Sequence, residues 1–96
     1  MVRAVILYER EPDPDRYARH LEDFVDKIEC DAFRHGKAFG AAVGEPAFAY
    51  QAEFEWADRD AFKAAARTEE FAASGKDAAD MGIPFTVTFV DLSQLS

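Results

Sequence analysis

The chain has 96 residues, which predicts one domain (residues 1–96), and its 11 basic and 19 acidic residues give a formal net charge of −8. This acidity repels phosphate groups, so it argues against nucleic acid and anionic membranes as partners. A single cysteine, Cys30, fits a reducing compartment, and no apolar run approaches the roughly 20 residues that span a bilayer, so we expect a soluble cytoplasmic protein.

The first two predicted elements are a strand and a helix. Residues Val2–Tyr8, VRAVILY, are apolar on both faces apart from Arg3, which predicts a short strand covered on both sides. Asp13 can cap a following helix that has Pro14 at its first position. Apolar residues then recur at helical spacing and predict an amphipathic helix over Pro14–Ile28: Tyr17, Leu21, Phe24, Val25 and Ile28.

The middle of the chain predicts two strands joined by a loop. Residues Cys30–Gly40 carry the weaker strand pattern, in which Gly36 predicts a bulge or a close backbone approach. Residues Gly40–Pro46 form the loop. Strict alternation over Ala47–Trp56 then predicts a central strand with large residues on one face: Phe48, Tyr50, Ala52, Phe54 and Trp56.

The last third of the chain predicts two helical pieces and a final strand. Asp58 can cap a short helix that ends near Arg67. Thr68 can cap a second helix that continues to about Ala79 and is ended by Gly82. Residues Ile83–Leu92 alternate between two faces and predict the last strand.

The order of these elements is β-α-β-β-α-β, with the second helix in two pieces. This order is typical of the ferredoxin-like α+β fold, in which a four-stranded antiparallel sheet carries its helices on one face. The other sheet face would be bare, and the apolar first strand and the aromatic central strand make it too apolar for water. We therefore expect a homodimer whose sheets pack face to face into a dimeric α/β barrel.

Several short motifs follow one another along these elements: the turn Pro12-Asp13 after Tyr8, Tyr17 to His20 as an F-x-x-H motif, Ala52-Glu53-Phe54 with Trp56 leading into Asp58–Phe62, Thr68-Glu69-Glu70, and Ala78-Ala79-Asp80. Together and in this order they resemble the EthD family of the dimeric α/β-barrel superfamily over nearly the whole chain. The chain departs from the family pattern at 23–30, which lacks the family's second histidine and Pro-Gly turn. The resemblance implies a pocket for a small, mostly apolar molecule.

Two histidines are candidate site residues, His20 as a catalytic acid or base and His35 as a substrate-binding residue. His20 lies at the edge of the predicted helix's apolar stripe, from which it can reach a pocket between helix and sheet. The alternative is a partly exposed histidine without a role. His35 follows Arg34, and adjacent strand residues point to opposite faces. The two can therefore serve one site only if Gly36 marks a bulge that redirects them.

Aromatic side chains with a polar group are candidates for binding a planar organic ligand. Tyr8, Tyr50 and Trp56 could line a barrel interior and orient such a ligand by one hydrogen bond. The sequence favours the alternative that these rings form a dimer core. Glu53 and Glu55 share the face opposite the aromatic rings, and we expect them to be polar groups at a helix-covered edge or in solvent rather than a catalytic pair.

The predicted function follows from the resemblance and these candidates. We expect a small EthD-like enzyme that acts on a small apolar or aromatic compound by metal-independent oxygenation or proton transfer, with His20 as acid or base and no cofactor. The two histidines and one cysteine have no metal-ligand spacing. The alternative is a non-catalytic ligand-binding or accessory protein that uses the same cavity. Haem binding is a weaker third hypothesis, because its axial histidine would have to face the interior.

Overall fold

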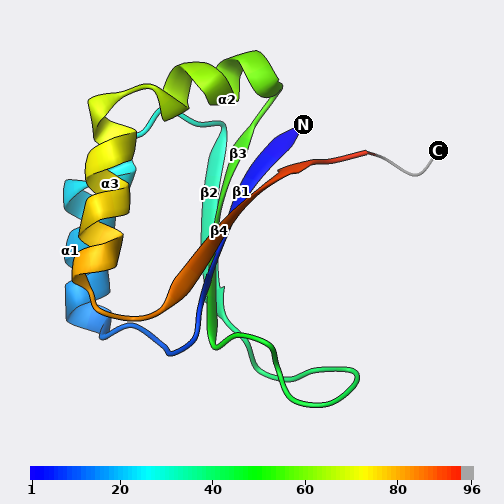
Figure 1. Cartoon of the computed structure of the whole chain (residues 1–96). Helices are drawn as coiled ribbons and strands as arrows, with labels where there is room; N and C mark the ends of the chain where they lie inside the picture. The colour runs from blue at the N-terminus through cyan, green and yellow to red at the C-terminus, as the bar shows by residue number, and fades with distance from the viewer. Residues whose placement is uncertain (94–96) are drawn as a thin grey trace.

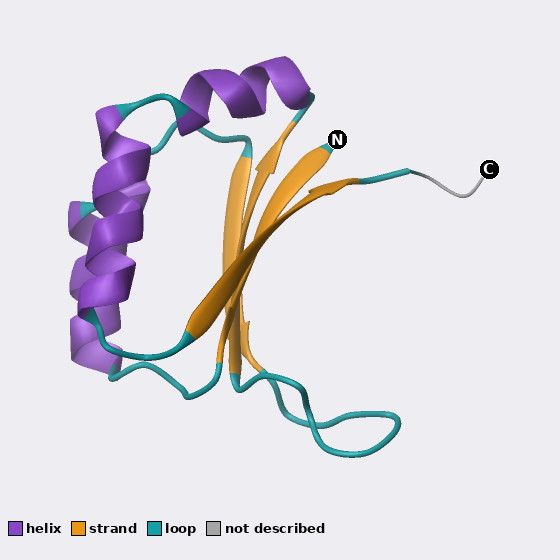
Figure 2. Cartoon of the chain, in the orientation of Figure 1, coloured by secondary structure: helices purple, strands orange, loops and turns teal. Residues whose placement is uncertain are grey.

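The computed structural model describes residues 1–93 and confirms the ferredoxin-like α+β fold. The four strands form one antiparallel sheet in the order β2-β3-β1-β4. Helices α1 and α3 lie side by side over one face of the sheet, and α2 crosses at one end (Figures 1 and 2). The elements are β1 (Val2–Tyr8), α1 (Pro14–Asp23), the 3-10 turn η1 (Val25–Lys27), β2 (Ala32–Lys37), β3 (Tyr50–Trp56), α2 (Arg59–Ala66), α3 (Glu69–Asp80) and β4 (Phe85–Asp91).

All three predicted N-caps are confirmed. The side chains of Asp13, Asp58 and Thr68 each accept a hydrogen bond from the backbone N–H three residues later. Helix α1 ends at Asp23, however, and the prediction of a helix through Ile28 is wrong. The backbone of Phe24 leaves the helical region, and η1 follows, which still buries Val25 and Ile28 against the sheet. The prediction extended the helix too far because apolar residues continue at helical spacing beyond its last residue.

The β2–β3 pairing is continuous, so the predicted bulge at Gly36 is wrong. Gly36 lies directly opposite Gln51, and a Cβ at this glycine would have no atom within 4 Å. Residues 38–49 form a loop, here called the β2–β3 loop, that extends past the sheet on the side away from the helices (Figure 1). Phe39 and Val43 in this loop are almost fully exposed.

The aromatic face of β3 belongs to the core of the protomer. Phe54 is 5% exposed and Trp56 is 2% exposed, beneath the helix layer. The Trp56 ring packs edge-on against Phe62 of α2, at a centroid distance of 5.2 Å, and Phe54 packs near Phe71 of α3. The preferred interpretation of these aromatic rings as a dimer core is therefore wrong, because the chain's own helices supply their cover.

The opposite sheet face, here called the open face, has no helix over it (Figure 2). Arg3 and Arg34 form ion pairs there with Glu53 and Glu55, the closest at 3.1 Å between Arg3 and Glu55. Beside this charged network lie half-buried apolar side chains: Val5 and Leu7 of β1 and Val90 of β4. The open face is thus a mixture of paired charges and aliphatic groups rather than an aromatic surface.

Within residues 1–93, no helix has both the length and the apolar character that crossing a bilayer requires.

Candidate functional site

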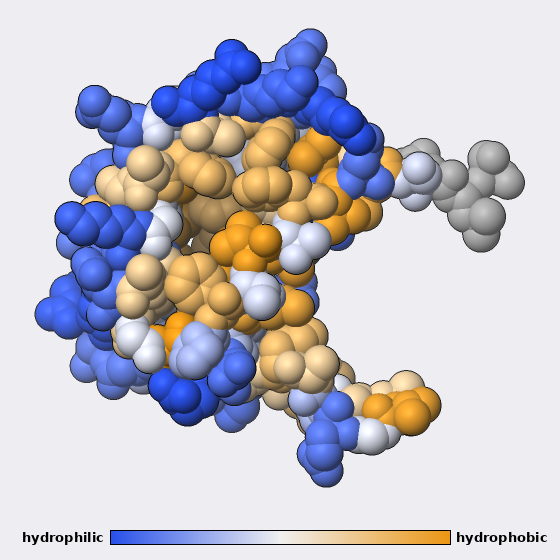
Figure 3. All heavy atoms as spheres, viewed as in Figure 1, coloured by the Kyte–Doolittle hydropathy of each residue, from blue (hydrophilic) through white to orange (hydrophobic). Residues whose placement is uncertain are grey.

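A cleft lies between the helix layer and the sheet. Its volume is about 80 Å³, and its walls come from α1, η1, α3 and all four strands. Most wall residues are apolar, the side chains with a polar atom are those of Tyr8, Tyr17, His20 and Ser74, and none of the wall residues is a lysine, arginine, aspartate or glutamate. Figure 3 shows the hollow among apolar side chains between α3 and β4, where the cleft opens to solvent.

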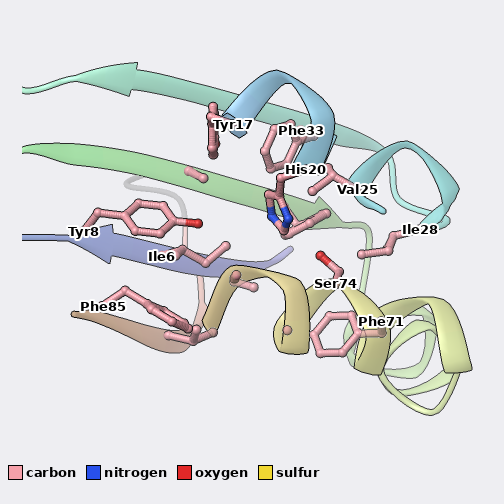
Figure 4. A pocket seen from close by; sticks show the side chains of 16 residues that line it. Ile6, Tyr8, Tyr17, His20, Val25, Ile28, Phe33, Phe71, Ser74 and Phe85 are labelled. Atoms are coloured by element: carbon pink, nitrogen blue, oxygen red, sulfur yellow. The ribbon is translucent and has the colours of Figure 1, made fainter. Parts of the chain in front are cut away.

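His20 is the titratable side chain in the wall of this cleft that can transfer a proton near neutral pH. It lies one turn after Tyr17 on the sheet-facing side of α1, and its residue is only 3% exposed. The imidazole is stacked on Phe24, with ring centroids 6.2 Å apart, and packs near Tyr17. Figure 4 shows the ring pointing into the cleft between α1 and α3.

A carboxylate on α3 holds the other side of the imidazole. His20 Nδ1 lies 2.8 Å from Asp77 Oδ2. Asp77 also accepts two hydrogen bonds from the Arg16 guanidinium, at 2.8 Å to Oδ1 and 3.0 Å to Oδ2. The three side chains form a ladder, Arg16–Asp77–His20, that links α1 to α3. The two hydrogen bonds from the guanidinium fix the orientation of the carboxylate, and the carboxylate in turn fixes the orientation of the imidazole ring.

The electrostatics of the ladder keep Asp77 ionised. Hydrogen bonds from Arg16 lower the pKa of Asp77 below its ordinary value, burial opposes them, and the hydrogen bond from His20 adds to the lowering. An ionised carboxylate accepts the Nδ1–H of His20, which leaves Nε2 as the basic nitrogen of the neutral ring. Within residues 1–93, no protein group forms a hydrogen bond with Nε2.

Two hydroxyl groups face the same cleft as His20. Tyr8, from β1, is 2% exposed, and burial raises its pKa to about 12, so its hydroxyl stays neutral. Ser74, from α3, is 6% exposed. Figure 4 shows both hydroxyls directed toward the space beside His20. In the described part of the chain neither hydroxyl has a hydrogen-bond partner, so each can bind a polar atom of a small molecule.

The structure brings together two of the five side chains that the sequence singled out. Tyr8 and His20 line the cleft. His35 and Tyr50 bind each other instead, with 2.7 Å between Nδ1 and the hydroxyl, and both pack against the Tyr17 ring outside the cleft. Trp56 lies in the core, where its Nε1–H donates a hydrogen bond to the carbonyl of Glu29. Arg34 points to the open face.

Sequence reasoning missed Arg16, Ser74 and Asp77. On α3, Ser74 and Asp77 are spaced i and i+3 with Ala78 at i+4, which places all three on one helix face. Because Ala78 is a small apolar residue suited to burial, this spacing indicates that Ser74 and Asp77 also lie on the buried side of the helix. The partnership of Asp77 with α1 was not visible, because it joins residues 57 positions apart. Asp80, which the family resemblance singled out, is exposed at the end of α3.

The arrangement is suited to proton transfer in an apolar environment. A histidine oriented by a carboxylate is the usual form of a general acid or base, and the surrounding rings exclude water from a bound molecule. Among residues 1–93, no group of three or more His, Cys, Asp or Glu side chains is placed to hold a metal ion.

Comparisons with known proteins place the chain among EthD-like structures. No protein-family model matches the sequence, and no curated protein matches it. An ethyl tert-butyl ether D (EthD) family protein from Bacillus halodurans C-125 superposes with a TM-score of 0.76 and 26% identity, over 97% of this chain and 99% of that one. The chain is EthD-like.

Two further solved structures share the fold of this EthD-like chain. A dimeric ferredoxin-like protein of unknown function from Thermobifida fusca YX has a TM-score of 0.66 and 18% identity, over 95% of this chain and 90% of that one. SnoaB from Streptomyces nogalater, described as a cofactor-independent oxygenase, has a TM-score of 0.61 and 19% identity, over 98% and 94%. The EthD resemblance seen in the sequence is thus confirmed, and the fold is common to proteins described as dimeric.

Proposed function

We propose that this EthD-like chain is an enzyme that binds a small apolar or aromatic compound in the cleft and moves a proton on it. His20 is the acid or base, through Nε2. Asp77 and Arg16 are positioning residues that fix its ring. One observation carries the proposal: a 2.8 Å contact orients the imidazole by a carboxylate at the wall of a cleft that is otherwise apolar.

Proton transfer is favoured over oxygenation by the same geometry. The described site contains a positioned base, and proton transfer needs no co-reactant besides the bound compound. Oxygenation is supported by the description of SnoaB as a cofactor-independent oxygenase, but at 19% identity that likeness concerns the fold. A non-catalytic ligand-binding or accessory protein is the second candidate, because a cleft of about 80 Å³ with apolar walls also fits simple sequestration.

We also propose that the protein acts as a homodimer joined through the open face. Solved structures with the same fold are described as dimeric. Leu7 and Val5 on the open face are aliphatic groups that no helix covers, and the ion pairs beside them contain equal numbers of both charges. A two-fold axis can therefore place arginines of one protomer opposite glutamates of its partner. The β2–β3 loop, which carries the exposed Phe39, extends toward the same side (Figure 1).

The experiment that tests the enzyme proposal compares two histidine variants. Small aromatic and alicyclic compounds are first screened for binding by NMR chemical-shift changes of cleft residues, and the compounds that bind are then assayed for conversion. His20→Asn should lower turnover by at least about 100-fold, as loss of a general acid or base does, while the Kd changes less than about threefold. His35→Asn is the matched control, because His35 lies outside the cleft, and it should keep full turnover.

Two results would decide against this role for His20. Turnover that survives His20→Asn would remove it as the acid or base. Binding of several compounds without conversion of any would favour the accessory-protein alternative.

A further inference from the structure

One hydroxyl in the wall of the cleft, that of Tyr8, indicates which compounds can bind there. The Tyr8 residue is 2% exposed, but its hydroxyl is not among the fully buried polar atoms and lies at the wall of the cleft. In residues 1–93 no protein group forms a hydrogen bond with it, so it is free to bind a polar atom of a ligand. Figure 4 shows this hydroxyl aimed across the cleft in the direction of His20, from the opposite wall.

The cleft disfavours a charged ligand. No lysine or arginine lines it to pair with an anion, and the guanidinium closest to His20, that of Arg16, is already bound to Asp77. Burying an ion without a partner costs several kcal/mol or more. The raised pKa of Tyr8 shows that burial at this wall already penalises a negative charge. The ligand is therefore neutral before it reacts.

A base and a hydroxyl donor on opposite walls define a chemical class of ligand. When His20 takes a proton from a neutral compound, negative charge develops on that compound, and only a hydrogen-bond donor in the cleft can stabilise it. A carbonyl compound meets this requirement, because the charge left by an α-proton moves onto the carbonyl oxygen. The Tyr8 hydroxyl, which stays protonated, is such a donor.

We infer that the cleft takes small neutral carbonyl compounds, with the Tyr8 hydroxyl bound to the carbonyl oxygen and His20 Nε2 placed at the adjacent carbon. This inference rests on the proposed acid–base role of His20. In the step, the α-carbon–hydrogen bond breaks and the proton goes to Nε2. Its electron pair forms a carbon–carbon double bond, and the carbonyl π pair moves to the oxygen as an enolate. Return of the proton from Nε2 to carbon restores the ketone, so no co-reactant is needed.

The test uses cyclohexanone and methylenecyclohexane, which have nearly the same shape but differ in the acceptor oxygen. Tyr8→Phe keeps the ring and removes the hydroxyl. It should weaken cyclohexanone binding about three- to tenfold, as loss of one hydrogen bond does, and leave methylenecyclohexane binding unchanged or tighter. Tyr50→Phe is the matched control: the Tyr50 hydroxyl lies outside the cleft and is bound to His35, so its removal should not separate the two probes.

The second readout is α-deuteration of cyclohexanone in D₂O, followed by loss of the α-proton NMR signal. The wild-type protein should accelerate this exchange, and Tyr8→Phe should slow the protein-dependent part by about 100-fold, as loss of a donor to a developing oxyanion does. His20→Asn should abolish it while keeping the Tyr8-dependent difference in binding between the two probes.

The outcomes separate this inference from the function on which it rests. If Tyr8→Phe affects both probes equally, or neither, the carbonyl assignment is wrong, even if His20 proves essential for turnover of another compound. If the wild type does not accelerate exchange, the enolisation step is wrong. Exchange that depends on Tyr8 but survives His20→Asn would keep the carbonyl site and overturn the role of His20.

Discussion

At the scale of single residues, Asp77 connects the stability of the fold to the site. Its carboxylate joins α1 to α3 through Arg16 and also sets which nitrogen of His20 is free. The same contacts therefore serve packing and proton transfer. A substitution at Asp77 should change both the pH dependence of stability and the rate of any His20-dependent reaction.

Asp77→Asn should lower stability most at neutral pH and least in acid. Because the folded-state pKa of Asp77 is below its unfolded value of 3.8, the unfolded chain binds this proton more tightly. The stability that the carboxylate contributes is present above the unfolded pKa and is lost as the pH falls through the folded pKa. Thermal melting at pH 7 and pH 3 tests this prediction, and a Tm difference from wild type that is equal at both pH values would contradict it.

Tyr17→Phe should stabilise the protein. The Tyr17 hydroxyl is buried and has no hydrogen-bond partner in the described residues, so it loses water without a replacement bond. Removing it while keeping the ring should raise the free energy of unfolding by about 1 kcal/mol, measured by urea denaturation. Tyr50→Phe is the control with the opposite sign, because it removes the 2.7 Å hydrogen bond to His35. A destabilised Tyr17→Phe would mean that this hydroxyl is paired.

At the scale of elements, a glycine in α3 lowers the stability of the helix but leaves room in the cleft. Gly75 lies in the interior of α3 and lines the cleft, and a Cβ there would have no atom within 4 Å. Gly75→Ala should therefore stabilise the protein by up to about 1 kcal/mol through helix propensity, a rise in Tm of about 4–8 °C. The added methyl group should at the same time reduce the cleft volume and weaken ligand binding.

The exposed Ala72 on the same helix provides the reverse control. Ala72→Gly should cost about 1 kcal/mol and leave ligand binding unchanged, because Ala72 does not line the cleft. If Gly75→Ala gained stability and bound ligands as tightly as wild type, the glycine would have no role in shaping the cleft.

The local part of the fold could be predicted from the sequence. Caps act within three residues and strand alternation acts within five, so Asp13, Asp58, Thr68 and the four strands were identified correctly. Alternation assigns side chains to two faces but does not say which face the helices cover. For that reason Phe54 and Trp56 were placed at a dimer interface, although Phe62 and Phe71 cover them within the protomer.

The site was predictable only in part, for a related reason. Periodicity put His20 at the edge of the apolar stripe of α1, whereas the structure buries it on the sheet-facing side, where Tyr8 of β1 also lines the cleft. The ladder through Asp77 depends on how α1 and α3 pack together, and no local pattern encodes that packing. His35 and Tyr50 were expected around the pocket, but they bind each other on facing strands and the Tyr17 ring separates them from the cleft.

At the scale of the whole molecule, the two faces of the sheet have different roles. The face under α1 and α3 carries the aromatic core and the cleft, and the open face carries Val5 and Leu7 beside the paired charges. A partner packed on the open face would leave the cleft mouth, between α3 and β4, accessible (Figure 3). We therefore expect each protomer of the proposed dimer to bind ligand independently, with one molecule bound per chain and no cooperativity between them.

The final prediction tests the dimer itself. Leu7→Arg puts a charge on the proposed interface, opposite Gln51 and Thr86 within its own sheet. The desolvation of that charge should convert the wild-type dimer into a monomer at micromolar concentration, while the fold remains intact because Leu7 points away from the helix layer. Analytical ultracentrifugation and native mass spectrometry would show a species of one chain mass, 10.7 kDa, in place of two.

Ala72→Arg places the same charge on the helix surface and should remain dimeric. A dimeric Leu7→Arg variant, or a monomeric wild-type protein, would exclude the open face as the interface. Retained ligand binding by monomeric Leu7→Arg would show in addition that one chain alone is sufficient to form the cleft.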